Sequence, residues 1–154
     1  MGRDGGDLWP ALGVKRRLLL DTNIVLDYCD AARADYEATC RFIRDSVERS
    51  VALLVTVGSL KDVYYVLSRL YASEPLARQV VSKLVAGPLT AVDLKASYAK
   101  AALESNEPDF EDGLVRAAAE TEGVFAIITR DGRAFEGSAV PTMSVVRYLE
   151  LFGG

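Results

Sequence analysis

The stretch that decides the fold runs from Arg17 to Asp21 and reads RLLLD. Its three consecutive leucines, ended at once by a polar residue, are typical of a short strand buried on both faces of a parallel sheet. The next segment, 22–30, reads TNIVLDYCD and has apolar residues at helical spacing, which predicts a short helix. A buried strand that leads directly into a helix indicates an α/β fold.

The same unit, a short apolar run followed by one or two helices, recurs along the chain. We expect further strands at 51–55, 89–92, 124–129 and 140–143. We expect further helices at 35–49, 59–71, 75–86, 95–104, 109–122 and 144–151. Strands that alternate with helices predict a three-layer α/β/α sandwich with a mainly parallel central sheet of about four to five strands.

Several residues indicate where these segments begin and end. Ser59 is expected to cap the helix that follows the second strand, and Pro75 to stand in the first turn of the next. Gly123 is expected to close the helix over 109–122. Residues 1–14 hold four of the 12 glycines and are predicted to form an N-terminal tail, which leaves 15–154 as a single domain.

The composition excludes several kinds of chemistry. The chain has 154 residues, no histidine, and a formal net charge of −4 from 18 Lys and Arg against 22 Asp and Glu. Without histidine, Ser-His-Asp catalysis and His-ligated zinc are excluded. The two cysteines, Cys29 and Cys40, suit a reducing cytoplasm, and no apolar run reaches membrane-span length. We therefore expect a cytoplasmic protein without a membrane partner. Because the chain is acidic overall, it would need a local binding feature to hold a polyanion such as nucleic acid.

Acidic residues follow the predicted strands. Asp21 ends the first, Asp62 lies in the helix after the second, Asp109 and Asp112 begin the helix before the fourth, and Asp131 follows the fourth. Each has an ordinary alternative explanation, because carboxylates are favoured at helix starts and in turns. In a parallel sheet, however, the carboxyl ends of the strands share one edge, so these five should converge there.

Converging carboxylates repel one another, and a hard divalent cation offsets that repulsion. Oxygen-only ligands suit Mg²⁺ or Mn²⁺, which retain waters and accept phosphate oxygens. Such an ion can polarise a phosphodiester and activate water without any histidine. The acidic set therefore favours a metal site that acts on a phosphodiester.

Four ordered segments resemble the motifs of PIN-domain nucleases. They read LLLDTNIVLD (18–27), SLKDVYYVL (59–67), DFEDGL (109–114) with AAA at 117–119, and IITRD (127–131). The resemblance covers about residues 17–135 and implies a PIN-like domain. It also implies metal-dependent cleavage of single-stranded RNA, and small VapC-like members of the family are toxins of type II toxin–antitoxin pairs. A protein antitoxin is therefore an expected partner.

The resemblance implies roles for individual residues. It assigns catalytic and metal-ligand roles to Asp21, Asp62, Asp112 and Asp131, with Asp109 as an additional ligand of Mg²⁺ or Mn²⁺. The family usually has Glu where this chain has Asp62, which shortens the side chain. A further departure is Gly113, which stands where a good helix former is commoner and costs about 1 kcal/mol relative to Ala. Both departures leave open a catalytically weak PIN-like module that binds RNA or protein.

Neighbouring polar residues have weaker assignments. Asn23 and Thr129 are placed to orient ligand carboxylates, unless they only cap a helix or a strand end. Lys61, Arg130 and Arg133 are candidate contacts to RNA phosphates, unless they form ordinary surface ion pairs.

A protein partner has its own candidate surface. The helices expected at 35–49 and 58–71 are rich in Tyr, Val and Leu, and Tyr65 and Val66 fall at the edge of the apolar stripe. An apolar groove between these helices would suit an amphipathic antitoxin helix. Burial in the core or in a homodimer interface is the alternative.

An aspartate-phosphorylating protein is the rival enzyme, with Asp21 as the acceptor. A HAD-type phosphatase would need a second Asp where this chain has Asn23, and a receiver domain needs a late lysine, yet none follows Lys100. Both therefore fit the sequence poorly.

Overall fold

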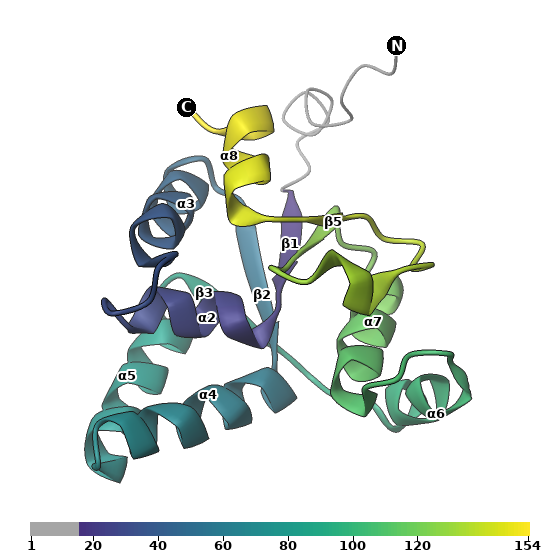
Figure 1. Cartoon of the computed structure of the whole chain (residues 1–154), viewed down its shortest axis with the longest axis horizontal. Helices are drawn as coiled ribbons and strands as arrows, with labels where there is room; N and C mark the ends of the chain where they lie inside the picture. Colours follow the sequence, from purple (N-terminus) through teal and green to yellow (C-terminus); the bar gives the residue numbers. More distant parts are fainter. Residues whose placement is uncertain (1–15) are drawn as a thin grey trace.

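The computed structural model describes residues 16–154, and strand β1 (Arg17–Leu20) lies at the centre of its sheet (Figure 1). The other strands are β2 (Ala52–Thr56), β3 (Leu89–Val92), β4 (Ala126–Ile128) and β5 (Thr142–Met143). All neighbouring strands pair in parallel, in the order β3-β2-β1-β4-β5. The predicted parallel sheet is confirmed, with five strands.

Helices cover both faces of the sheet and complete the predicted three layers. They are α2 (Thr22–Cys29), α3 (Tyr36–Glu48), α4 (Val57–Leu70), α5 (Glu74–Ala86), α6 (Ala96–Glu104), α7 (Phe110–Glu122) and α8 (Val145–Phe152), with a short 3₁₀ helix, η2 (Gly132–Phe135). The central strand explains the layering, because Leu18 and Leu20 enter one apolar core and Leu19 enters the other. The first core packs α2 to α5 and α8 on the sheet, and the second packs α6, α7 and η2.

Most predicted helix ends are confirmed, but the start of α4 is not. Ser73 caps α5, so Pro75 stands in its first turn as expected, and Gly123 ends α7 with a left-handed φ of 62°. Helix α4 begins at Val57, because the side chain of Thr56 accepts a hydrogen bond from the backbone N–H of Ser59 at 3.0 Å. Ser59 is therefore a buried residue of the first turn and not the cap.

The last third of the chain differs most from expectation. Strands β4 and β5 are shorter than the apolar runs at 124–129 and 140–143, and the 3₁₀ helix between them was not predicted. In the described part of the chain, no helix is long and apolar enough to cross a membrane. The predicted tail, residues 1–14, lies outside the described residues.

Gly113 is required by packing, which corrects its interpretation as a weak point. It is buried in α7 where that helix crosses α6, and an added Cβ would lie 2.8 Å from the Cβ of Ala102 and 3.2 Å from its Cα. These atoms are not the far end of a flexible side chain, so the helices would have to separate. The missing side chain allows α6 to support the start of α7, where Asp109 and Asp112 lie.

We predict that Gly113→Ala destabilises the protein, although Ala is the better helix former. Overpacking of this kind costs about 1–3 kcal/mol, which outweighs the roughly 1 kcal/mol gained in helix propensity. Urea unfolding should show the loss, and adding Ala102→Gly should recover part of it by removing the clashing Cβ. A more stable Gly113→Ala protein would mean that α6 and α7 do not pack this closely in solution.

Candidate active site

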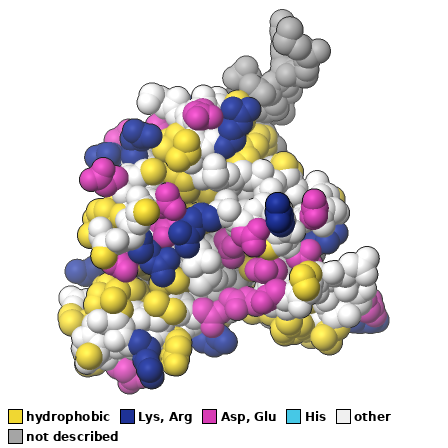
Figure 2. Space-filling model, in the orientation of Figure 1, with side chains coloured by type: hydrophobic (Ala, Val, Ile, Leu, Met, Phe, Trp, Pro, Cys, Tyr) yellow, Lys and Arg dark blue, Asp and Glu magenta, His cyan; other side chains and the backbone are white. Residues whose placement is uncertain are grey.

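The predicted acidic residues gather where the chain changes direction across the sheet. After β1 the chain builds β2 and β3 on one side and then crosses to β4 on the other. This switch point at the carboxyl ends of the strands is where open α/β sheets bind ligands. Asp21 follows β1 and Asp131 lies close after β4. In Figure 2 acidic side chains form a patch in the middle of the visible face, with basic side chains directly beside it.

Asp21 is held in place by both of its carboxylate oxygens. Oδ1 accepts from the backbone N–H of Thr22, and Oδ2 accepts from the Thr129 hydroxyl, each at 2.9 Å. The Thr129 hydroxyl also accepts from the backbone N–H of Asp131 at 3.1 Å. Burial raises the pKa of Asp21 and the charges of Asp131 and Asp109 add to it, whereas the two hydrogen bonds lower it. Thr129 thus contacts the carboxylate of Asp21 and the backbone of Asp131, two of the predicted ligands.

Asp112 is where the carboxylates crowd most. Asp109 caps α7 by accepting from the backbone N–H of Asp112 at 3.0 Å, which leaves the Asp112 side chain outside that cap. Burial, followed by the charges of Asp21, Asp109, Glu107 and Asp131, raises the pKa of Asp112 to about 6. Capping alone explains Asp109, but it does not explain why Asp112 faces this many like charges.

Asp62 belongs to a pair that the sequence did not reveal. Its carboxyl group shares a hydrogen bond with Glu111, a residue that was not among the predicted site residues. That bond, burial and the nearby charges of Asp62 and Asp109 raise the pKa of Glu111 to about 7, whereas the bond lowers the pKa of Asp62. The Thr22 hydroxyl donates to Glu111 Oε1 at 3.4 Å, which brings the pair beside Asp21. The only signal in the sequence was an extra acidic residue within the DFED motif.

The remaining predicted residues take up separate positions. Asn23 is exposed in the first turn of α2, and Lys61 forms an ion pair of 3.3 Å with Asp62. Arg133 is exposed in η2, where its backbone N–H donates to Asp131 Oδ1 at 3.1 Å. Lys61 and Arg133 therefore both lie next to acidic site residues.

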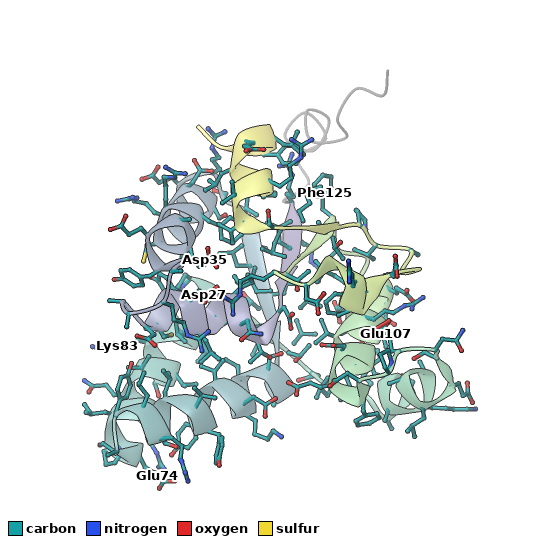
Figure 3. All side chains as sticks on the ribbon, in the orientation of Figure 1. Asp27, Asp35, Glu74, Lys83, Glu107 and Phe125 are labelled. Atoms are coloured by element: carbon teal, nitrogen blue, oxygen red, sulfur yellow. The ribbon has the colours of Figure 1, made fainter. Side chains whose placement is uncertain are left out.

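Arg130 is part of an ion-pair network around a buried aspartate. Asp27 has a fully buried side chain and pairs with Arg33 at 3.2 Å and with Arg130 at 3.4 Å. Arg130 also pairs with the exposed Asp35 at 3.5 Å. Figure 3 labels Asp27 and Asp35, which lie close together beside α2.

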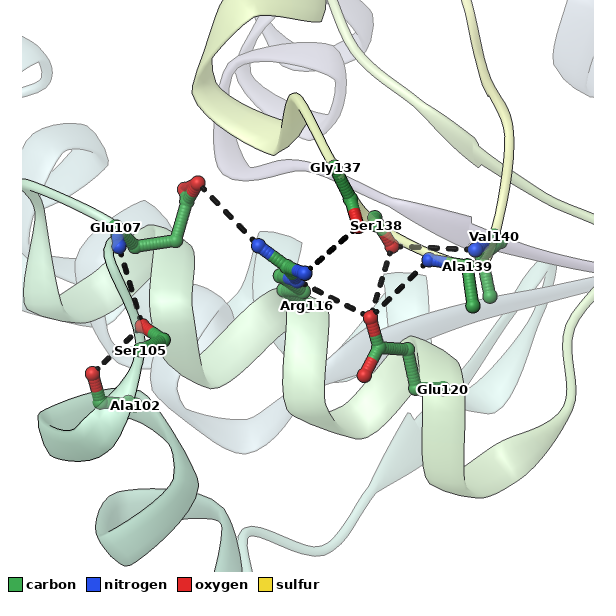
Figure 4. Close-up of polar contacts among 9 residues, drawn as sticks. All are labelled: Ala102, Ser105, Glu107, Arg116, Glu120, Gly137, Ser138, Ala139 and Val140. Atoms are coloured by element: carbon green, nitrogen blue, oxygen red, sulfur yellow. Dashed lines mark hydrogen bonds and ion pairs between the residues drawn. The ribbon is translucent and has the colours of Figure 1, made fainter.

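A second network connects α7 with the segment that precedes it and with the segment that follows η2 (Figure 4). Arg116 of α7 donates to Glu120 at 3.1 Å and to the backbone carbonyl of Gly137 at 2.9 Å. It also forms an ion pair of 3.8 Å with Glu107, whose side chain is 5% exposed. Glu120 in turn accepts from the Ser138 hydroxyl at 3.2 Å. One arginine therefore ties the segment before α7 and the segment after η2 to the same helix.

The site's donors fit a hard divalent ion chemically, although they do not form a closed cage. All are carboxylate oxygens, and Asp21 is oriented through both of its oxygens. Among residues 16–154, no three His, Cys, Asp or Glu side chains are grouped tightly enough to enclose a metal ion. Mg²⁺ characteristically keeps several waters and uses one or two carboxylates together with substrate phosphates, so an open acidic set suits it.

The large surface cavity lies away from the carboxylates, between α3 and α5. It has a volume of about 1250 Å³ and is lined mainly by apolar groups, among them Tyr28, Ile43, Val47 and Val80. The groove was expected between the helices at 35–49 and 58–71, so its second wall is α5 and not α4. Tyr65, on α4, is 61% exposed outside this cavity.

Comparisons with known proteins agree with this architecture. Ribonuclease VapC1 of Aquifex aeolicus (strain VF5) is 24% identical over 136 residues, which cover 87% of this chain and 94% of the relative. Mycobacterium tuberculosis VapC20, a sarcin-ricin loop cleaving toxin, has a similar structure with a TM-score of 0.62 at 14% identity over 76% of this chain and 92% of that one. DNA-bound VapBC from Salmonella typhimurium also has a TM-score of 0.62, at 15% identity over 84% and 98%.

A toxin–antitoxin complex from Klebsiella pneumoniae has a TM-score of 0.60 at 17% identity, covering 83% of this chain and 97% of that chain. At these identities the solved structures support the fold alone. The model of the PIN domain family matches residues 17–133. Because that match spans most of the chain, the protein belongs to the PIN domain family.

Proposed function

We propose that this protein is a metal-dependent endoribonuclease that cleaves single-stranded RNA, and that it is the toxin of a toxin–antitoxin pair. The observation that carries the proposal is the convergence of Asp21, Asp109, Asp112 and Asp131, whose like charges add to the effect of burial and raise the pKa of Asp112 to about 6. Such crowding destabilises a protein without a cation, and it suits a protein that binds one. The relationship to a protein named a ribonuclease supports the same reaction.

In the proposed reaction, some residues of the chain would hold the metal ion and others would transfer a proton. Asp21, Asp112 and Asp131 would hold Mg²⁺ or Mn²⁺, with Asp109 as a further ligand and Asp62 beside it. When bound, the ion would polarise the phosphodiester and acidify a water molecule. Thr129 would keep Asp21 aimed at the site. The hydrogen-bonded pair of Asp62 and Glu111 holds one proton and titrates near neutral pH, so Glu111 can release or accept a proton there.

The rival functions are less well supported. The strand order 3-2-1-4-5 differs from the 2-1-3-4-5 order of receiver domains, and the family match argues against a HAD-type phosphatase. The catalytically weak module keeps one argument, the shortened acidic residue at position 62. Glu111 weakens that argument, because it brings a second carboxylate to the same place.

An antitoxin would occupy the groove between α3 and α5. Two of the similar structures are a toxin–antitoxin complex and a VapBC complex, and the groove offers a mainly apolar surface of the kind that an amphipathic helix covers. Val47 lines it and is 54% exposed, so it adds apolar surface that a partner helix would bury. We therefore assign the partner surface to this groove and the chemistry to the separate acidic patch.

Cleavage of single-stranded RNA should require Mg²⁺ or Mn²⁺ and should be abolished by Asp21→Asn. Asp62→Ala should lower the rate about tenfold or more, because it removes one site carboxylate. Asp62→Glu should preserve or raise the rate, because it restores the family's longer side chain.

Asp93→Asn is the matched control for these cleavage assays. Asp93 directly follows edge strand β3 and is exposed, away from the switch point, so its variant should cleave normally. Metal-dependent cleavage that survives Asp21→Asn would place the reaction elsewhere, and full activity in Asp62→Ala would remove Asp62 from the site.

Mg²⁺ should raise the melting temperature more at about pH 8 than at about pH 6. The pKa of Glu111 is about 7 and that of Asp112 about 6, both above their ordinary values. The folded metal-free protein therefore loses stability as pH rises from the ordinary carboxyl pKa of about 4 to the raised values of about 6 and 7, and a cation competes with fewer protons above pH 7. Differential scanning fluorimetry tests this, and Asp21→Asn with Asp112→Asn should remove the response. An equal shift in wild type and double variant would mean that the ion binds elsewhere.

Val47→Glu should weaken antitoxin binding without affecting cleavage by the free protein. The change places a charge in the apolar groove at a half-exposed position, so the fold should tolerate it. Val146→Glu on α8 is the control, because Val146 is 50% exposed and lies outside the groove. Co-purification with the product of the neighbouring reading frame, followed by RNA cleavage by the complex, measures both effects. Equal binding by both variants would locate the antitoxin outside the groove.

A further inference from the structure

Asp27 is a charged residue at an unusual place, the fully buried face of α2. Its Oδ1 accepts from Arg33 Nη1 at 3.2 Å, and its Oδ2 lies 3.4 Å from Arg130 Nε. Oδ2 is buried and has no hydrogen bond within the described residues, so the Arg130 charge is its compensation. A buried carboxylate needs such partners, and both guanidinium groups are consequently held against it.

The two arginines are fixed on one side only. Arg33 contacts Asp27 through Nη1 and Asp30 through Nε, and Arg130 contacts Asp27 through Nε and Asp35 through Nη1. The Nη2 group of each arginine takes no part in these contacts. Arg130 remains 43% exposed and Arg33 27%. Planar guanidinium groups that are already oriented lose less entropy when they bind a phosphate.

This pair of arginines lies beside the acidic patch. Arg130 lies between Thr129, which holds Asp21, and Asp131. Figure 2 shows basic side chains on the same face as the acidic patch and directly beside it, in the region where Figure 3 labels Asp27 and Asp35. A protein with a net charge of −4 repels RNA overall, so RNA would need oriented, partly exposed guanidinium groups to hold it locally.

We propose that Arg33 and Arg130, held by the buried Asp27, form a clamp for a backbone phosphate of single-stranded RNA next to the cleavage site. This inference rests on the proposed function for the identity of the polyanion. Arg33 was not recognised from the sequence, because its role depends on Asp27 and on Arg130, which is far away in the chain.

The carboxylate of Asp35 binds Arg130 where an RNA phosphate would bind, so it competes with that phosphate. Its carboxylate is 46% exposed and contacts Arg130 at 3.5 Å, a pair of the exposed kind that contributes little to stability. Asp35 is also the N-cap of α3, but its side chain makes no capping hydrogen bond, so Asn can replace it without loss to the helix. RNA phosphate would displace Asp35 from Arg130 and leave Asp27 in place.

The discriminating experiment compares Asp35→Asn with Glu150→Gln, both introduced into the Asp21→Asn protein so that RNA is bound and not cut. Glu150 is also exposed and paired with an arginine, Arg147 at 3.3 Å, so each variant removes one negative charge and one surface ion pair. Binding of a fluorescent oligouridine should tighten about threefold or more in Asp35→Asn and change little in Glu150→Gln. Equal affinities in the two variants would overturn the clamp.

Substitutions of Arg33 should have the opposite effect to Asp35→Asn. Arg33→Gln should weaken RNA binding and lower the dependence of log Kd on log salt by about 0.7, the value for one phosphate contact on a single strand. Arg33→Lys keeps a positive charge beside Asp27, so this variant should remain folded. Its affinity for RNA should lie between the affinities of the protein with Arg33 and of Arg33→Gln. Unchanged affinity in folded Arg33→Lys and Arg33→Gln proteins would overturn the proposal. If Asp35→Asn raised the affinity for an oligoglutamate peptide but not for RNA, the proposal would be overturned, and the ligand of the arginines would be a protein carboxylate.

The clamp and the proposed nuclease fail in different ways. Cleavage is measured in the protein that keeps its native Asp21. If cleavage is metal-dependent and its KM is unaffected by Asp35→Asn and by Arg33→Lys, the nuclease proposal stands and the clamp is overturned. RNA binding that follows the expected order, in a protein without metal-dependent cleavage, would retain the clamp and remove the nuclease.

Discussion

The backbone hydrogen bond from Asp21 N to Ile128 O, at 3.0 Å, closes the ladder between β1 and β4 at its carboxyl end. This pairing makes two distant parts of the chain end at the same level, since Leu20 stands opposite Ile128. Asp21 and Thr129 are then neighbours, and their side chains meet at 2.9 Å. The acidic patch, the metal chemistry proposed for it and the adjacent arginines all depend on this alignment of strand ends.

Much of this arrangement could be predicted because it is encoded locally. The leucines at 18–20, the alternation of strands and helices and the endings at Pro75 and Gly123 predict the layers and most helix bounds. The convergence of the aspartates follows from the parallel topology alone, because the carboxyl ends of parallel strands share one edge.

What could not be predicted depends on contacts between distant residues. Gly113 looks unfavourable within its own helix, and only the Cβ of Ala102 in α6 explains it. Glu111 acquires its role from Asp62 in another helix, and no pattern within the DFED motif indicates that partner. Ser59 was the expected cap of α4, but Thr56, the last residue of β2, caps the helix instead, because its side chain accepts from the backbone N–H of Ser59.

The hydrogen bonds around Thr129 also have a direction. The backbone N–H of Asp131 can only donate, so it uses a lone pair of the Thr129 hydroxyl, and the single hydroxyl proton points to Asp21. The hydrogen bonds therefore have one donor-to-acceptor direction, from the Asp131 backbone through Thr129 to Asp21. If the Thr129 proton pointed to the Asp131 amide instead, two donors would face each other there and two acceptors would face each other at Asp21. Serine at position 129 would preserve this directed chain, whereas valine, of nearly the same shape, would leave the Asp131 amide and an Asp21 oxygen without a partner.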